Sequence, residues 1–412
     1  MAFGVGAFTQ GMLRVLREDG ARVSTYLTRN YAHHAPSLEG PTFDFARHPN
    51  PVPLLRRHKI DFVVPMSIEW VQKPWCHDLL QSGVPIFSPT GEAMQLERDR
   101  DFARKLCRRF AIPFPESHVA MNLRQAEKIL RRAPKPYVIK NPICSPTSPV
   151  HTIVCESVED TRGWLPHINY AEGIFLQEYM GRAEAGHIAL VSGGEIHSLV
   201  TNQEYKRAFD GNMGIVAGAP LGGLVERDPG DKYGLAKNLL HPLLPWFRKT
   251  NFHGPVQVTA IRRRSRWHVL EYNVRIGVTS GPMILRLFEN PLEILHAVSR
   301  NQSLNLRWRK SARFGCSLTL AGFGYPYVKV EGPALPIEVD GKITCDVWWN
   351  EVTSGPQGKL HMTGHRICDV VAVGPTLAGV ISRAYENIKK IRCLGSYFRT
   401  DIGQTLWPPG SE

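Results

Sequence analysis

The stretch WHVLEYNVR, residues 267–275, decides the fold that we expect for this chain. Apolar and polar residues alternate through Val269, Glu271 and Asn273, which is typical of a β-strand. Because a strand sends every second side chain to the same face, Glu271 and Asn273 are expected to project together, with Arg275 beside them. A carboxylate and an amide oxygen side by side are hard oxygen ligands that suit Mg²⁺. The alternative is an edge strand whose polar face only meets water.

Four runs of sequence, in one order along the chain, extend this pattern. They are SPTGEAMQLE (88–97), QEYKRAFDGNMG (203–214), VLEYNVRIG (269–277) and YFRTDIG (397–403). In these runs the chain resembles the phosphoribosylamine-glycine ligases, ATP-grasp enzymes of purine synthesis. The resemblance extends from about residue 85 to residue 403.

The resemblance implies an α/β fold of the ATP-grasp ligase type with three parts. These are an N-terminal doubly wound domain (1–88), an ATP-grasp domain (89–304) that includes a small lid subdomain (115–181), and a small C-terminal α/β domain (305–412). Local patterns agree at the N-terminus, where a turn with Gly4 and Gly6 precedes an amphipathic helix and the runs ARVSTYLT and IDFVVPMS look like parallel strands. Residues 88–112 are periodic and predict one helix that stops before Pro113.

Composition narrows the class of protein. The chain has 412 residues, 43% of them hydrophobic, which is enough for several packed domains, and its apolar runs fall short of the roughly 20 residues of a membrane span. The eight cysteines are scattered without metal-binding spacing, so we expect reduced thiols and a cytoplasmic protein. The net charge of +13 is dispersed, and its densest run, RRRSR at 262–266, is expected in a hairpin turn. We therefore expect small anionic substrates rather than nucleic acid or a membrane, and a monomer or homodimer.

The resemblance also implies roles for particular residues. Glu271 and Asn273 would bind the metal ion, Mg²⁺ or Mn²⁺, and Lys206 and Arg275 would stabilise the transferring phosphoryl group as catalytic residues. The residues that would contact ATP are Arg100, Lys140, Gln177, Glu178, Lys206 and Arg207. The alternative for Lys140 is a solvated strand end, and for Arg399 with Asp401 it is an internal ion pair.

The chain departs from the family at the loop that would cover ATP. A Gly-rich loop with a lysine is replaced by ICSPTSPVH, residues 143–151, whose prolines remove backbone donors and stiffen the chain. Either the hydroxyls of Ser145, Thr147 and Ser148 contact phosphates, or the loop is not a working lid. The family's Gly-Asp-Pro-Glu after the metal strand becomes GVTS, residues 277–280.

A second departure concerns the amine substrate. The family's Gly-Gly-Arg-Glu-His loop is replaced by GAFTQ, residues 6–10, which offers only Thr9, Gln10 and the ring of Phe8. Its Gly-Pro-Glu-Ala-Pro-Leu loop is replaced by PMSIEW, residues 65–70.

We therefore predict an ATP-dependent carboxylate-amine ligase that forms an amide through an acyl phosphate, with altered substrates and a place in specialised metabolism. One alternative is a genuine phosphoribosylamine-glycine ligase of purine biosynthesis. Another is a non-catalytic nucleotide-binding protein that keeps the fold. Turnover of ATP separates the ligases from the binding protein.

Overall fold

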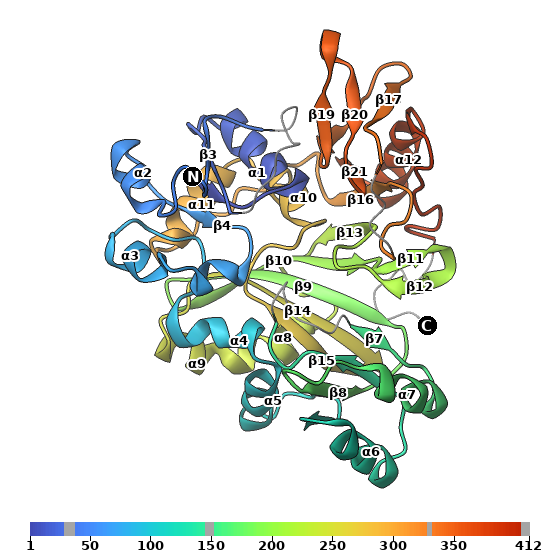
Figure 1. Ribbon diagram of the computed structural model, residues 1–412. Coiled ribbons are helices and arrows are strands. Elements are labelled where there is room, and N and C mark those ends of the chain that lie inside the picture. Colours follow the sequence, from blue (N-terminus) through green and yellow to red (C-terminus); the bar gives the residue numbers. More distant parts are fainter. Residues whose placement is uncertain (29–37, 145–151, 328–331, 405–412) are drawn as a thin grey trace.

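A parallel sheet begins the chain in the computed structural model, which describes residues 1–28, 38–144, 152–327 and 332–404. Its strands lie in the order β3 (Thr42–Asp44), β2 (Thr25–Leu27), β1 (Ala2–Phe3) and β4 (Val64–Pro65). The helices around it are α1 (Ala7–Glu18), α2 (Val52–Arg57) and α3 (Cys76–Gln81) (Figure 1). Ala2 shares a core with α1, whereas Phe3 packs with α2 and α3 on the opposite face. The N-terminal part is doubly wound, as predicted.

Residues 88–112 do not form the single helix that their periodicity predicts. They fold as α4 (Gln95–Arg98) and α5 (Arg100–Arg109), which are separated at Asp99. Asp99 has extended backbone angles, and its carboxylate accepts hydrogen bonds from two backbone N–H groups in the first turn of α5. The break turns Arg100 toward the next part of the chain, where its N–H donates to the carbonyl of Pro142.

A small antiparallel sheet follows, drawn in teal and green at the lower right of Figure 1. Its strands lie in the order β5 (Ser117–Ala120), β8 (Ile174–Glu178), β6 (Tyr137–Lys140) and β7 (Ile153–Val154). Helices α6 (Leu123–Arg132) and α7 (Val158–Trp164) cover one face, where Ile139 and Leu176 lie in a separate core. We refer to this unit as the small subdomain.

A large antiparallel sheet runs through the middle of the molecule. Its order is β15 (Arg266–Asn273), β14 (Gly254–Arg263), β9 (Glu184–Ser192), β10 (Glu195–Glu204), β13 (Gly222–Arg227), β16 (Phe314–Ala321), β21 (Arg366–Gly374) and β18 (Asp346–Trp349). The basic run RRRSR forms the turn between β14 and β15, as expected. The sheet continues across the predicted boundary between residues 304 and 305, and the domain limits stay predictions.

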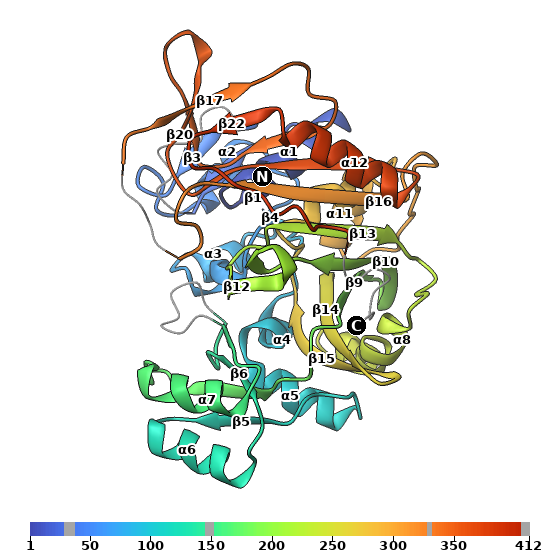
Figure 2. The ribbon, with the colours of Figure 1, turned by 90° about the vertical axis from the view of Figure 1, so that its right-hand side faces the viewer.

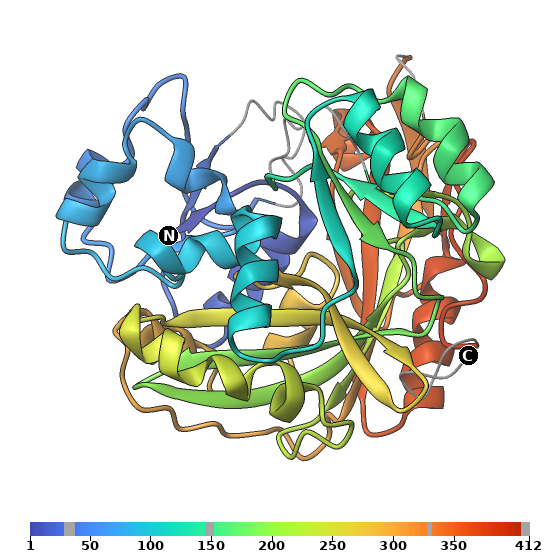
Figure 3. The same ribbon diagram turned by 90° about the horizontal axis from the view of Figure 1, so that it is seen from below.

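The remaining elements surround this sheet. Helices α8 (Leu235–Leu239), α9 (Leu244–Lys249), α10 (Gly281–Leu285) and α11 (Pro291–Ser299) connect its strands, and β11 (Arg207–Phe209) pairs with β12 (Met213–Val216). A third small sheet has the order β19 (Val352–Ser354), β20 (Leu360–Met362), β17 (Leu335–Val339) and β22 (Ile391–Cys393). Helix α12 (Leu377–Ile388) packs on β16 and β21 (Figure 2). Seen from below, the blue N-terminal part and the red C-terminal part lie on opposite sides (Figure 3).

The end of the chain is fixed by a buried ion pair. The guanidinium of Arg399 donates to both carboxylate oxygens of Asp401, at 2.9 and 2.6 Å. The same guanidinium bonds the carbonyl of Arg207 and the side chain of Asn212, so it holds the hairpin of β11 and β12. The internal ion pair that the sequence offered as an alternative is present.

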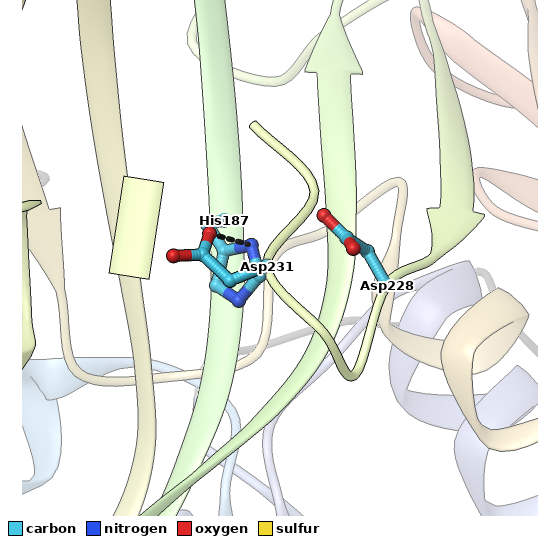
Figure 4. A group of neighbouring side chains, drawn as sticks. All are labelled: His187, Asp228 and Asp231. Carbon is cyan, nitrogen blue, oxygen red and sulfur yellow. Dashed lines mark ion pairs between the residues drawn. The ribbon is translucent and has the colours of Figure 1, made fainter. Parts of the chain in front are cut away.

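A buried histidine holds the loop that follows β13. Nδ1 of His187 on β9 lies 3.2 Å from the hydroxyl of Thr201 and 3.8 Å from the carboxylate of Asp231 (Figure 4). The hydroxyl donates to Asp228, which also accepts from the N–H of Lys232, and two N–H groups of α8 donate to Asp231. Although the three side chains lie close enough to hold a metal ion, their carboxylates already fix the loop, and we assign them a structural role.

Across the part of the chain that the structure describes, the helices lack the length and apolar character that a membrane span requires.

Candidate active site

A cleft of about 530 Å³ lies between the small subdomain and the large sheet. Every residue that the sequence assigns to the site lines this cleft: Arg100, Lys140, Gln177, Glu178, Lys206, Arg207, Glu271, Asn273 and Arg275. The structure brings together residues that are up to 175 positions apart in the chain. The role of each residue stays a prediction.

A β-bulge in β15 sends Val269 and Glu271 in opposite directions. The register with β14 shifts between Val269 and Glu271, so Leu270 is an extra residue in the ladder. Val269 and Tyr272 are therefore both buried in the core, while Glu271 and Asn273 line the cleft. The alternation that the sequence suggests is therefore interrupted at Val269, which an unbroken strand would send to the same face as Glu271, but it holds from Glu271 to Asn273.

Cations surround the carboxylate of Glu271. One of its oxygens lies 3.3 Å from Nζ of Lys206, and the other lies 3.3 Å from the guanidinium of Arg100. Burial alone raises the pKa of Glu271, but Lys206, Lys140 and Arg100 outweigh burial and hold the pKa well below its usual range. The group is therefore ionised at ordinary pH, as a carboxylate ligand of a metal ion must be.

Lys206 lies among three carboxylates. Its Nζ is 3.3 Å from Glu271, 3.8 Å from Glu184 and 3.9 Å from Glu204. Burial lowers the pKa of Lys206, but the three carboxylates outweigh burial and raise it above its usual value. Burial raises the pKa of Glu204 in spite of the nearby ammonium group. Sequence reasoning missed Glu184 and Glu204, which stand at the first residue of β9 and the last residue of β10.

Lys140 is buried rather than at a solvated strand end. The residue is 6% exposed, and its Nζ donates a 2.8 Å hydrogen bond to the side-chain oxygen of Gln177. Burial, and then the charge of Arg100, lower the pKa of Lys140 to about 8. The amide of Gln177 also donates to the carbonyl of Leu270, so the small subdomain contacts the bulge of β15 directly.

Arg275 is held by Glu97, which lies in one of the family-like runs but received no role from the sequence. Nε of Arg275 lies 3.0 Å from one oxygen of Glu97, and the N–H of Val274 donates to the other at 2.7 Å. Burial raises the pKa of Glu97 more strongly than Arg275 lowers it. This pair ties α4 to the end of β15 and fixes the guanidinium at the cleft.

Glu178 and Arg207 make ion pairs at the rim of the cleft. The carboxylate of Glu178 lies 3.1 Å from Arg263 and 3.4 Å from Lys135. The guanidinium of Arg207 lies 2.9 Å from Glu156 of the small subdomain. These contacts join the small subdomain to the large sheet and to the β11–β12 hairpin.

β14 contributes Gln257, which sequence reasoning also missed. Gln257 pairs with Asn273 across the ladder and lines the cleft. The signal was the polar alternation of Gln257 and Thr259 within GPVQVTAI, next to the metal strand.

The N-terminus of α1 is closed by a side chain from the C-terminal part. Oδ1 of Asn350 accepts a 3.0 Å hydrogen bond from the N–H of Ala7. Gly6 has a φ of 86°, and a Cβ there would lie 2.9 Å from the same oxygen. Gly6 therefore serves a tight turn and a close approach of Asn350.

Thr9 and Gln10 do not offer their polar groups to a substrate, and this prediction was wrong. Thr9 is buried and its hydroxyl donates to the carbonyl of Val5. Gln10 is buried too, and its side-chain oxygen accepts from the N–H of Glu39. On an amphipathic helix these positions face the sheet.

The predicted lid loop reaches the cleft at its start, where Ile143 and Cys144 line the wall. Its hydroxyl residues Ser145, Thr147 and Ser148 lie outside the described residues.

This arrangement of sheets occurs in enzymes of known structure. The crystal structure of phosphoribosylamine–glycine ligase from Thermotoga maritima superposes with a TM-score of 0.77 at 20% identity, covering 97% of this chain and 98% of that one. The biotin carboxylase of Campylobacter jejuni in complex with β-γ-ATP has a TM-score of 0.70 at 11% identity, with 96% and 92% covered. The protein has the fold of the ATP-grasp ligases.

Sequence comparisons identify the family to which the chain belongs. Residues 98–279 match the family described as phosphoribosylglycinamide synthetase, ATP-grasp (A) domain, and residues 316–405 match its C domain. The phosphoribosylamine–glycine ligase of Streptomyces coelicolor is 26% identical over 333 residues, which cover 78% of each chain. The chain belongs to the phosphoribosylamine-glycine ligase family and forms a C–N bond.

Proposed function

We propose that this ligase joins glycine to phosphoribosylamine with hydrolysis of ATP to ADP and phosphate, the reaction that the names of its relatives describe. The comparisons favour this alternative over the altered substrates that the sequence suggested. The observation that carries the proposal is that Glu271 and Asn273 both line a cleft that is also lined by cationic side chains.

The donor set of the cleft suits ATP with Mg²⁺. Glu271 and Asn273 offer the hard oxygen ligands that Mg²⁺ prefers, and Mg²⁺ commonly takes one or two such protein groups besides phosphate oxygens. A volume of about 530 Å³ falls in the range of small-molecule sites, roughly 300–1,000 Å³. When bound, the ion would supply positive charge that offsets the charge of the phosphates.

The protein's own residues would supply positioning and charge. Lys140, Lys206 and Arg275 would stabilise the phosphoryl group as it passes to the substrate carboxylate. The amine would then attack the acyl phosphate, with phosphate as the leaving group. Burial of these cations strengthens their action, because a site shielded from water screens charge less.

The test is an assay of purified protein with Mg²⁺, ATP, glycine and phosphoribosylamine generated in place. We expect ADP and the amide to form at a rate normal for an enzyme, roughly 1 per second or more. Nucleotide binding without turnover by any pool of amines and amino acids would favour the non-catalytic alternative.

A second candidate keeps the reaction and changes the amine. The N-terminus of α1 is occupied by Asn350, and residues 6–10 contain no cationic side chain. A site of this kind binds a phosphate dianion weakly, because charge-assisted hydrogen bonds are about twice as strong as neutral ones. A panel of uncharged amines beside phosphoribosylamine distinguishes the candidates, since faster turnover of an uncharged amine would replace the first proposal with this one.

A further inference from the structure

A small polar cavity adjoins the cleft on one face of the large sheet. Its volume is about 10 Å³, which is the space of one water-sized guest. Strands β9, β10 and β14 form its walls, and it shares Glu184, Glu204, Lys206 and Gln257 with the cleft. The predicted metal ligands on β15 do not line the cavity, but they are the neighbours of its residues Gln257 and Thr259 in the sheet.

Gly186 creates this cavity. In the sheet it lies in register between Asn202 on β10 and Thr259 on β14. A Cβ atom at Gly186 would lie 2.3 Å from Oδ1 of Asn202, which is far inside van der Waals contact. The absence of a side chain at Gly186 therefore leaves the space that the amide of Asn202 and the hydroxyl of Thr259 line.

Two buried polar atoms of the cavity wall have no hydrogen-bond partner among the described residues. They are Oδ1 of Asn202 and Oγ1 of Thr259, in residues that are 1% and 4% exposed. A buried polar atom without a partner is destabilising, because it has given up its hydrogen bonds to water. The amide oxygen only accepts hydrogen bonds, so its missing partner must carry a hydrogen atom or a positive charge.

Two carboxylates that line the cavity share one ammonium group. Glu184 and Glu204 lie 3.8 and 3.9 Å from Nζ of Lys206, which also pairs with Glu271. A water molecule would satisfy only the hydrogen bonds of the cavity, whereas a cation would also attract both carboxylates. A monovalent ion repels the neighbouring ammonium group less than a divalent ion does.

We propose that this cavity binds one monovalent cation of the size of a potassium ion, held by the side-chain oxygens of Asn202, Thr259, Glu184 and Glu204. In potassium channels, amide carbonyl oxygens replace the hydration shell of the ion, and in other cation channels rings of Asp and Glu side chains select cations. The ion takes over the neutralisation of Glu184 and Glu204, which leaves Lys206 available to nucleotide phosphates. The consequence is a ligase that requires a particular monovalent salt as well as Mg²⁺.

The direct test measures binding without any ligase assay, so its failure is distinct from failure of the proposed function. Melting midpoints of the nucleotide-free protein are compared in potassium, sodium, lithium and tetramethylammonium chloride at equal ionic strength. We expect a saturable rise of the midpoint with potassium, and none with tetramethylammonium, which is too large for the cavity. Equal midpoints in all four salts would overturn the proposal and leave a buried water in the cavity.

Two variants assign the effect to the cavity. Gly186→Ala fills the space and should abolish the potassium-specific rise, whereas Gly163→Ala, where a Cβ meets nothing within 4 Å, should retain it. Thr259→Val removes one oxygen at nearly constant volume and should weaken potassium binding several-fold if Gly186→Ala fails to fold. Thallium(I) replaces potassium in crystals, and its anomalous signal should lie between Asn202 and Thr259. Thallium signal elsewhere only, or a potassium response unchanged in Thr259→Val, would contradict the assignment.

Discussion

The ammonium group of Lys206 lies 3.3 Å from the carboxylate of Glu271, so the residue predicted to contact phosphate holds the residue predicted to bind the metal ion. A metal ion at Glu271 must compete with this ammonium group. We expect the metal ion to displace Lys206 toward the phosphates of ATP. Binding of the metal ion and binding of ATP should therefore strengthen each other.

Glu271→Gln should remove turnover of ATP while the protein stays folded. Glutamine has the same shape but no charge, and Lys206 keeps Glu184 and Glu204 as partners. We expect a loss of at least about 100-fold in the rate of ADP release, as for loss of an important metal-site group. The matched control is Glu127→Gln on α6, whose side chain is 46% exposed and which should retain full activity. Equal rates for the two variants would exclude Glu271 as a metal ligand.

Lys206→Met should bind Mn²⁺ more tightly than the native protein when nucleotide is absent. Removal of the competing ammonium group frees one oxygen of Glu271. The loss of a partly buried ion pair worth about 1 kcal/mol corresponds to a several-fold increase in Mn²⁺ affinity. Electron paramagnetic resonance of free Mn²⁺ measures the change. The same variant should lose ATP turnover because its phosphate contact is gone. Weaker Mn²⁺ binding would show that the ammonium group supports the metal site.

Lys140 should make ATP binding depend on pH. Its pKa in the folded protein is about 8, against an ordinary value of 10.5, so its charge is lost as the pH rises through 8. ATP affinity should then fall by up to about tenfold per pH unit between pH 8 and 10. Lys140→Arg stays charged and should remove this fall, whereas Lys128→Ala, an exposed control on α6, should keep it. Calorimetric titration at pH 7 and 9 provides the measurement.

The same shift affects stability with the opposite sign. Between pH 8 and 10.5 the unfolded chain binds more protons at this lysine than the folded chain does. The contribution of Lys140 to the free energy of unfolding therefore rises with pH across this interval. Urea titrations at several pH values measure the difference in the free energy of unfolding between the native protein and Lys140→Met. A difference that stayed constant across this pH interval would contradict the lowered pKa of Lys140.

Arg399→Met should destabilise the protein by about 3–5 kcal/mol, because it leaves the carboxylate of Asp401 buried without its partner. It should also lower activity, since Arg399 bonds the backbone of Arg207 at the cleft. Arg392→Met removes an exposed pair with Asp340 and should change stability by less than about 1 kcal/mol. Urea unfolding of both variants provides the comparison. Similar values for both would show that the buried pair contributes little.

The sequence predicted the fold class from the four runs, and five of the nine predicted cleft residues lie within these runs. The other four, Arg100, Lys140, Gln177 and Glu178, were assigned from the segments that the resemblance places between the runs. It failed where tertiary contacts override local pattern. The bulge at Leu270 depends on pairing with β14, and the break at Asp99 depends on the contact of Arg100 with Pro142. A periodic run records neither contact.

Side-chain direction was the second source of error. Thr9 and Gln10 were counted as the polar groups available to a substrate because they stand in place of the family's Gly-Gly-Arg-Glu-His loop, but the register of α1 turns them into the protein. The opposite error affected Glu184, Glu204 and Glu97. They contact Lys206 or Arg275 of the cleft, although no local pattern indicated this. A single acidic residue in a sequence does not reveal that three strands and a helix will bring it to a buried lysine or arginine.

The continuity of the large sheet across residue 305 affects how this chain can be shortened. β13 is paired on one side with β10 and on the other with β16, which belongs to the C-terminal part. A protein ended at residue 304 would present β13 as a bare edge, with unpaired amides and apolar neighbours that invite other chains. We therefore expect the two parts to be inherited together, and a truncated chain to aggregate rather than persist as a smaller nucleotide-binding protein.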